Sequence, residues 1–391
     1  LPPQSASGAQ VLALVQEDRL DAKNEEAVFQ WVVRWWEAAQ PTEAELLAAM
    51  KHVRFAVMDA GFVERTVRAW PALDSREGRN ILRDSLLEGG HALVRTGFGP
   101  RLVYVLGGSV GDDDWERLNT VETYDPRTDA WKQVSAMPTI RIQHTGVVLD
   151  SKIYAIGGYE DNDDRLSTAD VYDPQTDQWR PLAKMATGRV HFAAAAAAGK
   201  IYAIGGEIED RVGTATVEAF DPQLGAWAPV ANMSVERKCH AVAVVDGKIF
   251  AIGGLPLDPD GYGLDSVEVY DPQADSWQQV ASMPRRIHRH AATAMGGKIY
   301  VSGGDSDDDS TVSTLMVFDP QANTWTQLAS MGTARADHTS AAIGGKLYVF
   351  GGYHGSSGRR VSVEAYDPIS NKWARVSDLT EARDEFVAVT L

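Results

Sequence analysis

Cysteine is almost absent from this chain, because Cys239 is the only one in 391 residues. A single thiol excludes an internal disulfide and any zinc site built from several cysteines, and it fits a reducing compartment. No apolar run approaches the roughly 20 residues that cross a bilayer. Basic residues are also few: 37 Lys and Arg stand against 54 Asp and Glu, for a net charge of −17. This balance argues against binding to nucleic acid or to anionic membranes, and we expect a cytoplasmic protein that can also be nuclear.

Common enzyme motifs are missing as well. The sequence has no Gly-x-Ser-x-Gly segment and no glycine-rich phosphate loop. Its aspartate runs lack the twelve-residue spacing, the glycine and the terminal glutamate of an EF-hand. We therefore expect no metal, no cofactor and no catalytic residues. The chain opens at Leu1 without a signal segment, so we interpret it as a fragment or a processed form.

A long repeat dominates the rest of the sequence. An apolar segment that ends in two glycines occurs six times, at spacings of 48 or 50 residues. A tryptophan follows the first glycine by 22 or 24 residues, and an aromatic-Asp-Pro turn lies between them. The glycine pairs are Gly107-Gly108, Gly157-Gly158, Gly205-Gly206, Gly253-Gly254, Gly303-Gly304 and Gly351-Gly352. A period near fifty with this pattern predicts a repeat architecture.

Each repeat is predicted to form four strands, which in the second repeat are 145–150, 152–157, 168–172 and 178–182. One four-stranded sheet cannot bury both of its faces, whereas six sheets around an axis can. The alanine run 193–198 suits an innermost strand, where space is tight. The last strand, 385–391, is the type that the first repeat lacks, so we expect it to close blade one. The predicted organisation is a small all-α domain at 1–92, a linker at 93–100 and an all-β six-bladed propeller at 101–391.

The residues also resemble a known family. Residues 20–35 and 46–55 resemble two segments of a BACK domain, although a generic helical cap is the alternative. The repeats resemble kelch repeats across 101–391. Together they resemble the BTB-BACK-Kelch (Kelch-like) family, in which a BTB domain precedes the BACK domain; none is present in this sequence.

The resemblance implies a substrate-recognition adaptor of a cullin-3 ubiquitin ligase. Its propeller would bind a target protein, and cullin-3 would be reached only through the BTB region. Two alternatives stay open, namely an actin-binding or scaffold adaptor and a carbohydrate-acting propeller enzyme.

Two sets of loops are expected on one face of the propeller. Those that follow the glycine pairs are mostly acidic, while the sixth is basic. Those that precede the innermost strands carry a recurring arginine, which blade five replaces with Ile287 beside Arg286. The resemblance implies that such arginines bind acidic peptides; the alternative is that they brace the blade junctions. The candidate partner-binding residues are Arg141, Arg189, Arg237, Arg286, Arg335, Arg383, Tyr159, Asp161, Asp307, Tyr353 and His354.

Histidines and the lone cysteine give two further hypotheses. One histidine in each of five blades could suggest a metal ring, although we favour partly buried structural imidazoles. They are His144, His191, His240, His290 and His338. Cys239 follows Arg237 and Lys238, which could lower its thiol pKa; a buried core role is the alternative that we favour.

Overall fold

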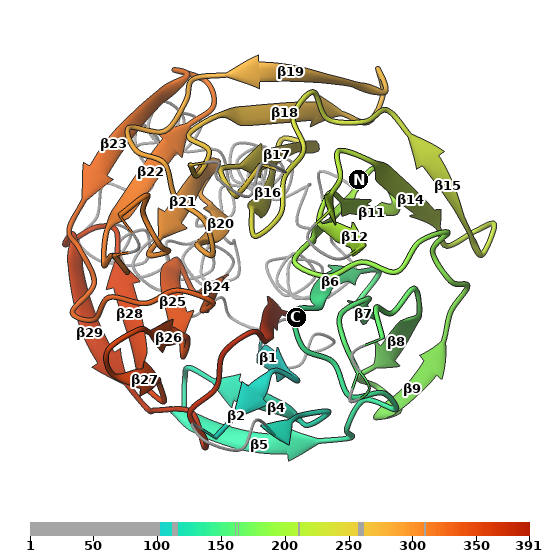
Figure 1. Ribbon diagram of the computed structural model, residues 1–391. Coiled ribbons are helices and arrows are strands. Elements are labelled where there is room, and N and C mark those ends of the chain that lie inside the picture. The colour runs from blue at the N-terminus through green and yellow to red at the C-terminus, as the bar shows by residue number, and fades with distance from the viewer. Residues whose placement is uncertain are drawn as a thin grey trace, which may run out of the picture. The chain divides into compact units, whose positions relative to one another are not determined.

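The computed structural model describes residues 102–111, 116–160, 162, 164–209, 212–256, 262–308 and 310–391. The chain divides into two units at Arg101 and Leu102, so the predicted helical domain and linker lie outside the described residues. The described part is built of strands, arranged as six antiparallel four-stranded sheets around one axis (Figure 1). The prediction of a six-bladed β-propeller is confirmed.

The blades follow each other in chain order, and the four strands of a blade succeed one another from the axis outward. Blade one contains β30 (Val387–Thr390), β1 (Val103–Leu106), β4 (Val121–Asp125) and β5 (Ala130–Val134). Blade two contains β6 (Thr145–Leu149), β7 (Lys152–Ile156), β8 (Ala169–Asp173) and β9 (Gln178–Pro181). Blade three contains β10 (Ala193–Ala197), β11 (Lys200–Ile204), β14 (Val217–Asp221) and β15 (Ala226–Val230).

The second half of the ring repeats this plan. Blade four contains β16 (Ala241–Val245), β17 (Lys248–Ile252), β18 (Val267–Asp271) and β19 (Ser276–Val280). Blade five contains β20 (Ala291–Met295), β21 (Lys298–Ser302), β22 (Leu315–Asp319) and β23 (Thr324–Leu328). Blade six contains β24 (Thr339–Ile343), β25 (Lys346–Phe350), β28 (Val363–Asp367) and β29 (Lys372–Val376). Three short hairpins are added by β2 (Ser109–Val110) with β3 (Glu116–Arg117), β12 (Glu207–Glu209) with β13 (Val212–Gly213), and β26 (Tyr353–His354) with β27 (Gly358–Arg359).

The two ends of the propeller meet in blade one. β30 pairs antiparallel with β1, from Val103 opposite Thr390 to Leu106 opposite Val387. Leu102 and Leu391 extend this pairing with two backbone hydrogen bonds of 2.7 and 3.0 Å. The last strand of the chain therefore supplies the innermost strand of the first blade, as the sequence predicts.

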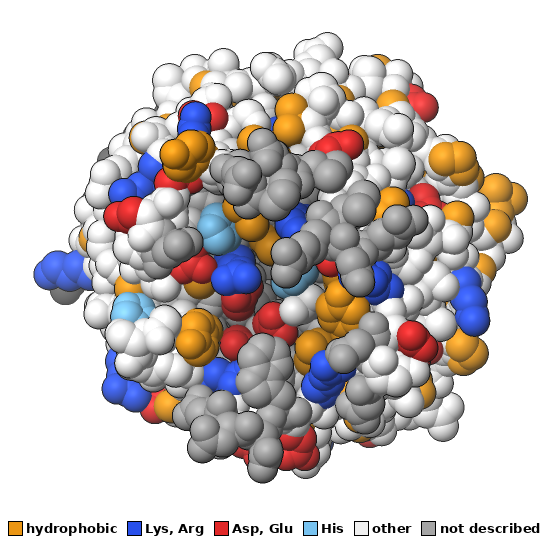
Figure 2. Space-filling view, viewed as in Figure 1, with side chains coloured by type: hydrophobic (Ala, Val, Ile, Leu, Met, Phe, Trp, Pro, Cys, Tyr) orange, Lys and Arg blue, Asp and Glu red, His pale blue; other side chains and the backbone are white. Residues whose placement is uncertain are grey.

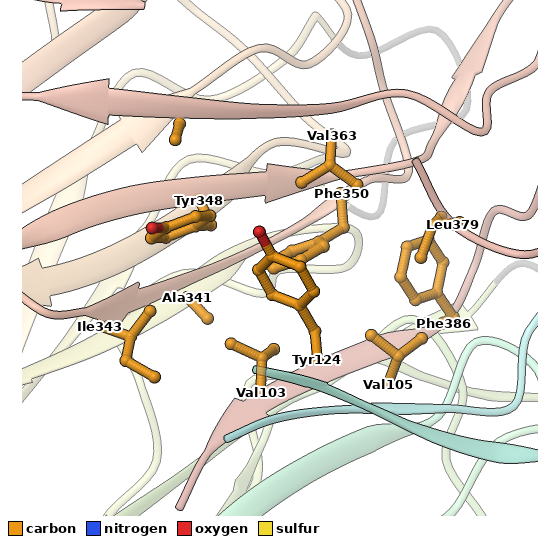
Figure 3. Packing of buried hydrophobic residues seen from close by; sticks show 11 residues of the cluster. Val103, Val105, Tyr124, Ala341, Ile343, Tyr348, Phe350, Val363, Leu379 and Phe386 are labelled. Carbon is orange, nitrogen blue, oxygen red and sulfur yellow. The ribbon is translucent and has the colours of Figure 1, made fainter. Parts of the chain in front are cut away.

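The apolar core lies between the blades. At the junction that closes the ring, Val103 and Tyr124 of blade one pack against Tyr348, Phe350 and Val363 of blade six (Figure 3). Five further clusters fill the other five junctions in the same way. Each blade is thus buried by its two neighbours, as the repeat period predicts.

Motif residues add polar links across these junctions. The Trp179 indole N–H donates to the Ser135 carbonyl of the preceding blade at 2.9 Å. Asp177 accepts from the Tyr172 hydroxyl at 2.6 Å and from the Ser135 backbone N–H at 3.0 Å. The aromatic-Asp-Pro turn and the tryptophan therefore work together as one connection between neighbouring blades.

The glycine pairs allow two loops to meet at one face. Gly158 has φ +92°, and a Cβ there would lie 2.5 Å from the Ile142 carbonyl oxygen and 2.7 Å from His144 Cβ. The absence of a side chain lets the loop after β7 approach the turn before β6, where Ile142 and Tyr159 form an isolated bridge. We call the surface formed by these two loop sets the hairpin face; it carries β2, β12 and β26 and is the side viewed in Figure 1.

Candidate partner-binding face

The hairpin face is hollowed at its centre, and acidic, basic and histidine side chains gather around the hollow (Figure 2). The predicted arginines do not form its floor, because five of them are at most 1% exposed. In blade two the Arg141 guanidinium donates to the Gly157 carbonyl at 2.7 Å, to the Thr168 carbonyl and hydroxyl at 3.2 and 2.9 Å, and to the Asp170 carboxylate at 2.7 Å. All four of these acceptors belong to the blade itself.

The same residue also holds the preceding blade. The Arg141 backbone N–H donates to Leu118 O at 3.3 Å, and its carbonyl accepts from Gly108 N–H at 3.1 Å. This arrangement recurs at the other junctions for Arg189, Arg237, Arg335 and Arg383. The bracing interpretation is therefore supported for five arginines, whose buried side chains are out of a partner's reach: Arg141, Arg189, Arg237, Arg335 and Arg383.

Blade five shows what replaces this brace. Ile287 occupies the arginine position, and Met316 occupies the position of the partner carboxylate; both are buried in one apolar cluster. Thr314, which corresponds to Thr168, keeps a buried hydroxyl that has no hydrogen-bond partner among the described residues. In blade five both members of the ion pair are thus replaced together. This is expected because either member alone would be an unpaired charge in the core.

Arg286, next to this exception, does reach the surface. Its side chain is 48% exposed and lies 3.7 Å from the Asp307 carboxylate. The guanidinium also lies over the ring of Tyr262, 5.7 Å from its centre. Asp307 in turn accepts from the Gly263 backbone N–H at 2.8 Å. The structure therefore brings together Arg286, Asp307 and Tyr262; the tyrosine was missed in the sequence, where only its place in an exposed loop could have marked it.

The other predicted loop residues are spread over the same face. Tyr353 is exposed, and His354 Nδ1 lies 3.1 Å from the hydroxyls of Ser356 and Ser357. Tyr159 is half-buried under the guanidinium of Arg165, 5.4 Å from the ring centre. Asp161 lies outside the described residues.

A ring of six turn residues surrounds the axis, and it was not predicted. We call it the axial ring; each member lies two residues after the arginine position and has a φ between 48° and 54°. The members are Gln143, His191, Cys239, Arg289, Asp337 and Glu385. Each donates its backbone N–H to the carbonyl of the previous member, at 2.9–3.3 Å, so that six hydrogen bonds close a circle. This circle fixes the turns from which the side chains project.

The side chains of the axial ring differ in every blade. Arg289 lies 3.5 Å from Asp305 and 3.6 Å from Asp337, and the nearby Asp337 carboxylate raises its pKa. Burial lowers the pKa of His191. Burial raises the pKa of Cys239 to about 11, so this thiol is not activated.

Four histidines lie one position later and form part of the core. Burial lowers the pKa of His144, His240 and His290 to about 3 and lowers that of His338 as well. Phe192 and Phe386 fill the same position in blades three and one and are likewise buried, so an uncharged aromatic ring suits this position. His191 is therefore out of register with the other histidines. Within the described ranges, no group of three His, Cys, Asp or Glu side chains is placed to hold a metal ion.

Comparison with known proteins agrees with this geometry. The family model described as the KLHDC2/KLHL20/DRC7 Kelch-repeats domain matches residues 90–304 and 239–389. The chain belongs to this kelch-repeat family. A second model, BACK (BTB And C-terminal Kelch), matches residues 5–68, so the predicted BACK-Kelch combination is confirmed.

Individual relatives are similar over part of the chain. Kelch-like protein 3 of Homo sapiens is 33% identical over 173 residues, which is 40% of this chain and 28% of that protein. Kelch-like protein 3 of Danio rerio is 31% identical over 168 residues, with 38% and 27% covered. Kelch-like protein 2 of Homo sapiens is 30% identical over 165 residues, again with 38% and 27% covered. The matched segment thus spans less than a third of these relatives.

Among solved structures, the one titled "Structure of YjhT" superposes with a TM-score of 0.60 at 16% identity, covering 70% of this chain and 97% of that one. This likeness concerns the fold alone. Where the structure describes the chain, it contains no helix long and apolar enough to cross a membrane.

Proposed function

We propose that this chain is the substrate-recognition part of a cullin-3-type ubiquitin ligase adaptor and that its hairpin face binds the target protein. The observation that carries the proposal is the combination, in one chain, of a BACK match at residues 5–68 with a kelch propeller. A cullin contact would be made by a BTB region outside this sequence. Such an adaptor has no catalytic residues of its own, and we propose that it works in the cytoplasm, with or without a nuclear pool.

The hairpin face has properties that suit a protein partner. Tyr and Arg are the residue types that most often dominate binding energy at interfaces. Tyr262 is 66% exposed and Arg286 lies over its ring. Because Asp307 holds both the Arg286 guanidinium and the backbone of Gly263, this group loses little freedom on binding. The axial ring, locked by its backbone hydrogen bonds, gives a second rigid contact area.

One observation favours a second candidate, a carbohydrate-acting enzyme. Arg289, Asp337 and Glu385 are consecutive members of the axial ring, and a carbohydrate-acting propeller would place its acid and base groups near the axis. Arg289, however, is already occupied by Asp305 and Asp337. A panel of sugars incubated with the chain tests this candidate directly, since turnover would show it.

Proximity labelling in cells tests the adaptor proposal. The full-length protein should label cullin-3 and a target, and this 391-residue chain should label the target without cullin-3. R286E should reduce target labelling, whereas R180E, the same charge change at an exposed position on the outermost strand β9, should not. Recovery of neither cullin-3 nor a target with the full-length protein, or target labelling that R286E and R180E change alike, would contradict the proposal.

A further inference from the structure

The axial ring contains a carboxylate, Glu385, that has no ion-pair partner among the described residues. Glu385 Oε1 accepts a hydrogen bond from Gln143 Nε2 at 2.7 Å. Glu385 Oε2 and Gln143 Oε1 are both shielded from solvent and accept no hydrogen bond within the described ranges. Buried polar atoms are almost always paired. Two acceptors on adjacent turns therefore lack the same thing, a donor.

The charges around the ring do not balance. Arg289, the only Lys or Arg among the six ring members, is shared between Asp305 at 3.5 Å and Asp337 at 3.6 Å. Asp384, beside Glu385, is held by Arg359 at 2.8 Å. Glu385 has no ion pair among the residues that the structure describes. Arg289 therefore faces three carboxylates, Asp305, Asp337 and Glu385, and positive charge is in deficit around the ring.

The surroundings make this deficit costly. Burial raises the pKa of Glu385, and Asp384 adds to the effect, while His191 opposes it. Burial also raises the pKa of Asp337, where Glu385 adds to it and Arg289 opposes it. Both carboxyls thus lie where a negative charge is poorly solvated, and a cation that arrived there would interact strongly with them.

We infer that the axial ring receives a lysine or arginine side chain of the partner protein, held by Glu385 and Gln143 with Asp337 as the second carboxylate. This inference rests on the proposed function, and it names the chemistry of the partner. A protonated amine or guanidinium supplies both missing elements, the donor hydrogens and the positive charge. A neutral donor would supply only the first of them.

The ring is open to such a side chain. Asp337 and Glu385 are only partly covered, and charged side chains are visible around the hollow in Figure 2. The last torsion of a glutamate is broad, so Oε2 can change its direction without any movement of the backbone. The backbone circle keeps the turns fixed meanwhile, and the ring therefore needs little rearrangement to bind.

The test uses Nα-acetyl-lysine methylamide, whose side-chain ammonium is free, as the probe, and the corresponding norleucine compound as the uncharged control. Ligand-detected saturation-transfer NMR with the whole chain should show binding of the lysine probe and not of the norleucine one. E385Q keeps the side-chain shape and removes the charge, and it should weaken binding about tenfold, the effect expected for a hydrogen bond to a charged group. D337N, which suits the positive φ of 48°, should weaken it less.

D246N is the matched control. Asp246 is exposed at the opposite end of the blade, in the turn from β16 to β17, so the same loss of charge there should leave binding unchanged. The inference is overturned if lysine and norleucine probes bind alike, or if both E385Q and D337N, folded as judged by their unfolding midpoints, bind the lysine probe like the parent chain. Target labelling in cells that persists in E385Q would also overturn it while leaving the adaptor proposal intact. Lysine binding that depends on Glu385, without any captured target, would contradict the adaptor proposal alone.

Discussion

Blade five suggests a quantitative test of the buried arginines. Arg335 of blade six donates to Gly351 O at 2.7 Å, to Ser362 O and Oγ at 2.9 and 3.0 Å, and to Glu364 at 2.7 Å. R335I leaves Glu364 buried without its cation, and E364M leaves the cation without its carboxylate. Removing one member of a buried ion pair destabilises by about 3–5 kcal/mol. Each single variant should lose that much free energy of unfolding.

The double variant R335I/E364M copies the Ile287–Met316 pair that blade five already uses. It abolishes both charges and leaves three polar groups without their partner: the Ser362 hydroxyl, the Gly351 carbonyl and the Gly332 backbone N–H, which donates to Glu364 at 2.7 Å. Each costs about 1 kcal/mol at most. We expect a total loss of about 1–3 kcal/mol, far less than the roughly 6–10 kcal/mol of the summed singles.

Urea unfolding followed by tryptophan fluorescence measures the three variants, since urea does not screen ion pairs and the chain has 11 tryptophans. The converse pair, I287R and M316E, serves as a control in blade five and should also be better tolerated together than singly. Additive losses in R335I/E364M, or a loss below about 1 kcal/mol in R335I, would refute the bracing role.

Two further predictions concern stability. The pKa of His240 is lowered to about 3 in the folded state, against 6.5 for an unperturbed imidazole. Below pH 6.5 the histidine is therefore protonated in the unfolded chain before it is protonated in the folded one. The free energy of unfolding then falls by about 1.4 kcal/mol per pH unit for each such histidine. H240F, which copies Phe192, should reduce this slope by one such increment in urea midpoints measured from pH 7 to 5, and an unchanged slope would contradict it. W325F should be about 1 kcal/mol more destabilising than W131F. The Trp325 indole donates to Ala281 O at 2.9 Å, whereas the Trp131 indole is buried with no partner among the residues that the structure describes. Equal losses in the same assay would show that these hydrogen bonds do not contribute to stability.

The strands could be predicted from the sequence because their determinants are local. In blade two no observed strand end lies more than one residue from its predicted position. The strands end where predicted because Gly157-Gly158 and the Asp173-Pro174 turn stop them. The alanine run likewise forms β10, the innermost strand of blade three. Turn chemistry and small side chains act over a few residues, and the pattern repeats.

The role of the arginines depends on distant residues and was harder to predict. Arg141 is buried because its partners lie in and next to the third strand of its blade, Asp170 within β8 and Thr168 directly before it. The position of the arginine in a loop does not reveal these partners. One signal was available, because Ile287 and Met316 depart from the pattern in the same repeat. The axial ring depends on the closure of the whole circle, which brings together six turns that are far apart in the chain, so no single repeat shows it.

The closing junction explains part of the sequence variation on the hairpin face. Arg383 reaches Gly107 O only at 3.5 Å, and Thr120 Oγ1 is buried with no hydrogen-bond partner in the described part of the chain. Blade one is assembled from both ends of the propeller, so this brace is weaker than the arginine braces of the other blades. A different contact compensates for it.

In that contact, Asp384 accepts from the Ser109 hydroxyl at 2.6 Å and from Arg359 Nε at 2.8 Å, with all three side chains buried. Arg359 belongs to β27, within the basic loop that departs from the acidic character of the others. Its charge is used to hold blade six to blade one. The basic sixth loop is therefore not in itself a sign of an acidic partner. Tyr353 and His354, together with the exposed residues 355–357, remain for a partner to contact.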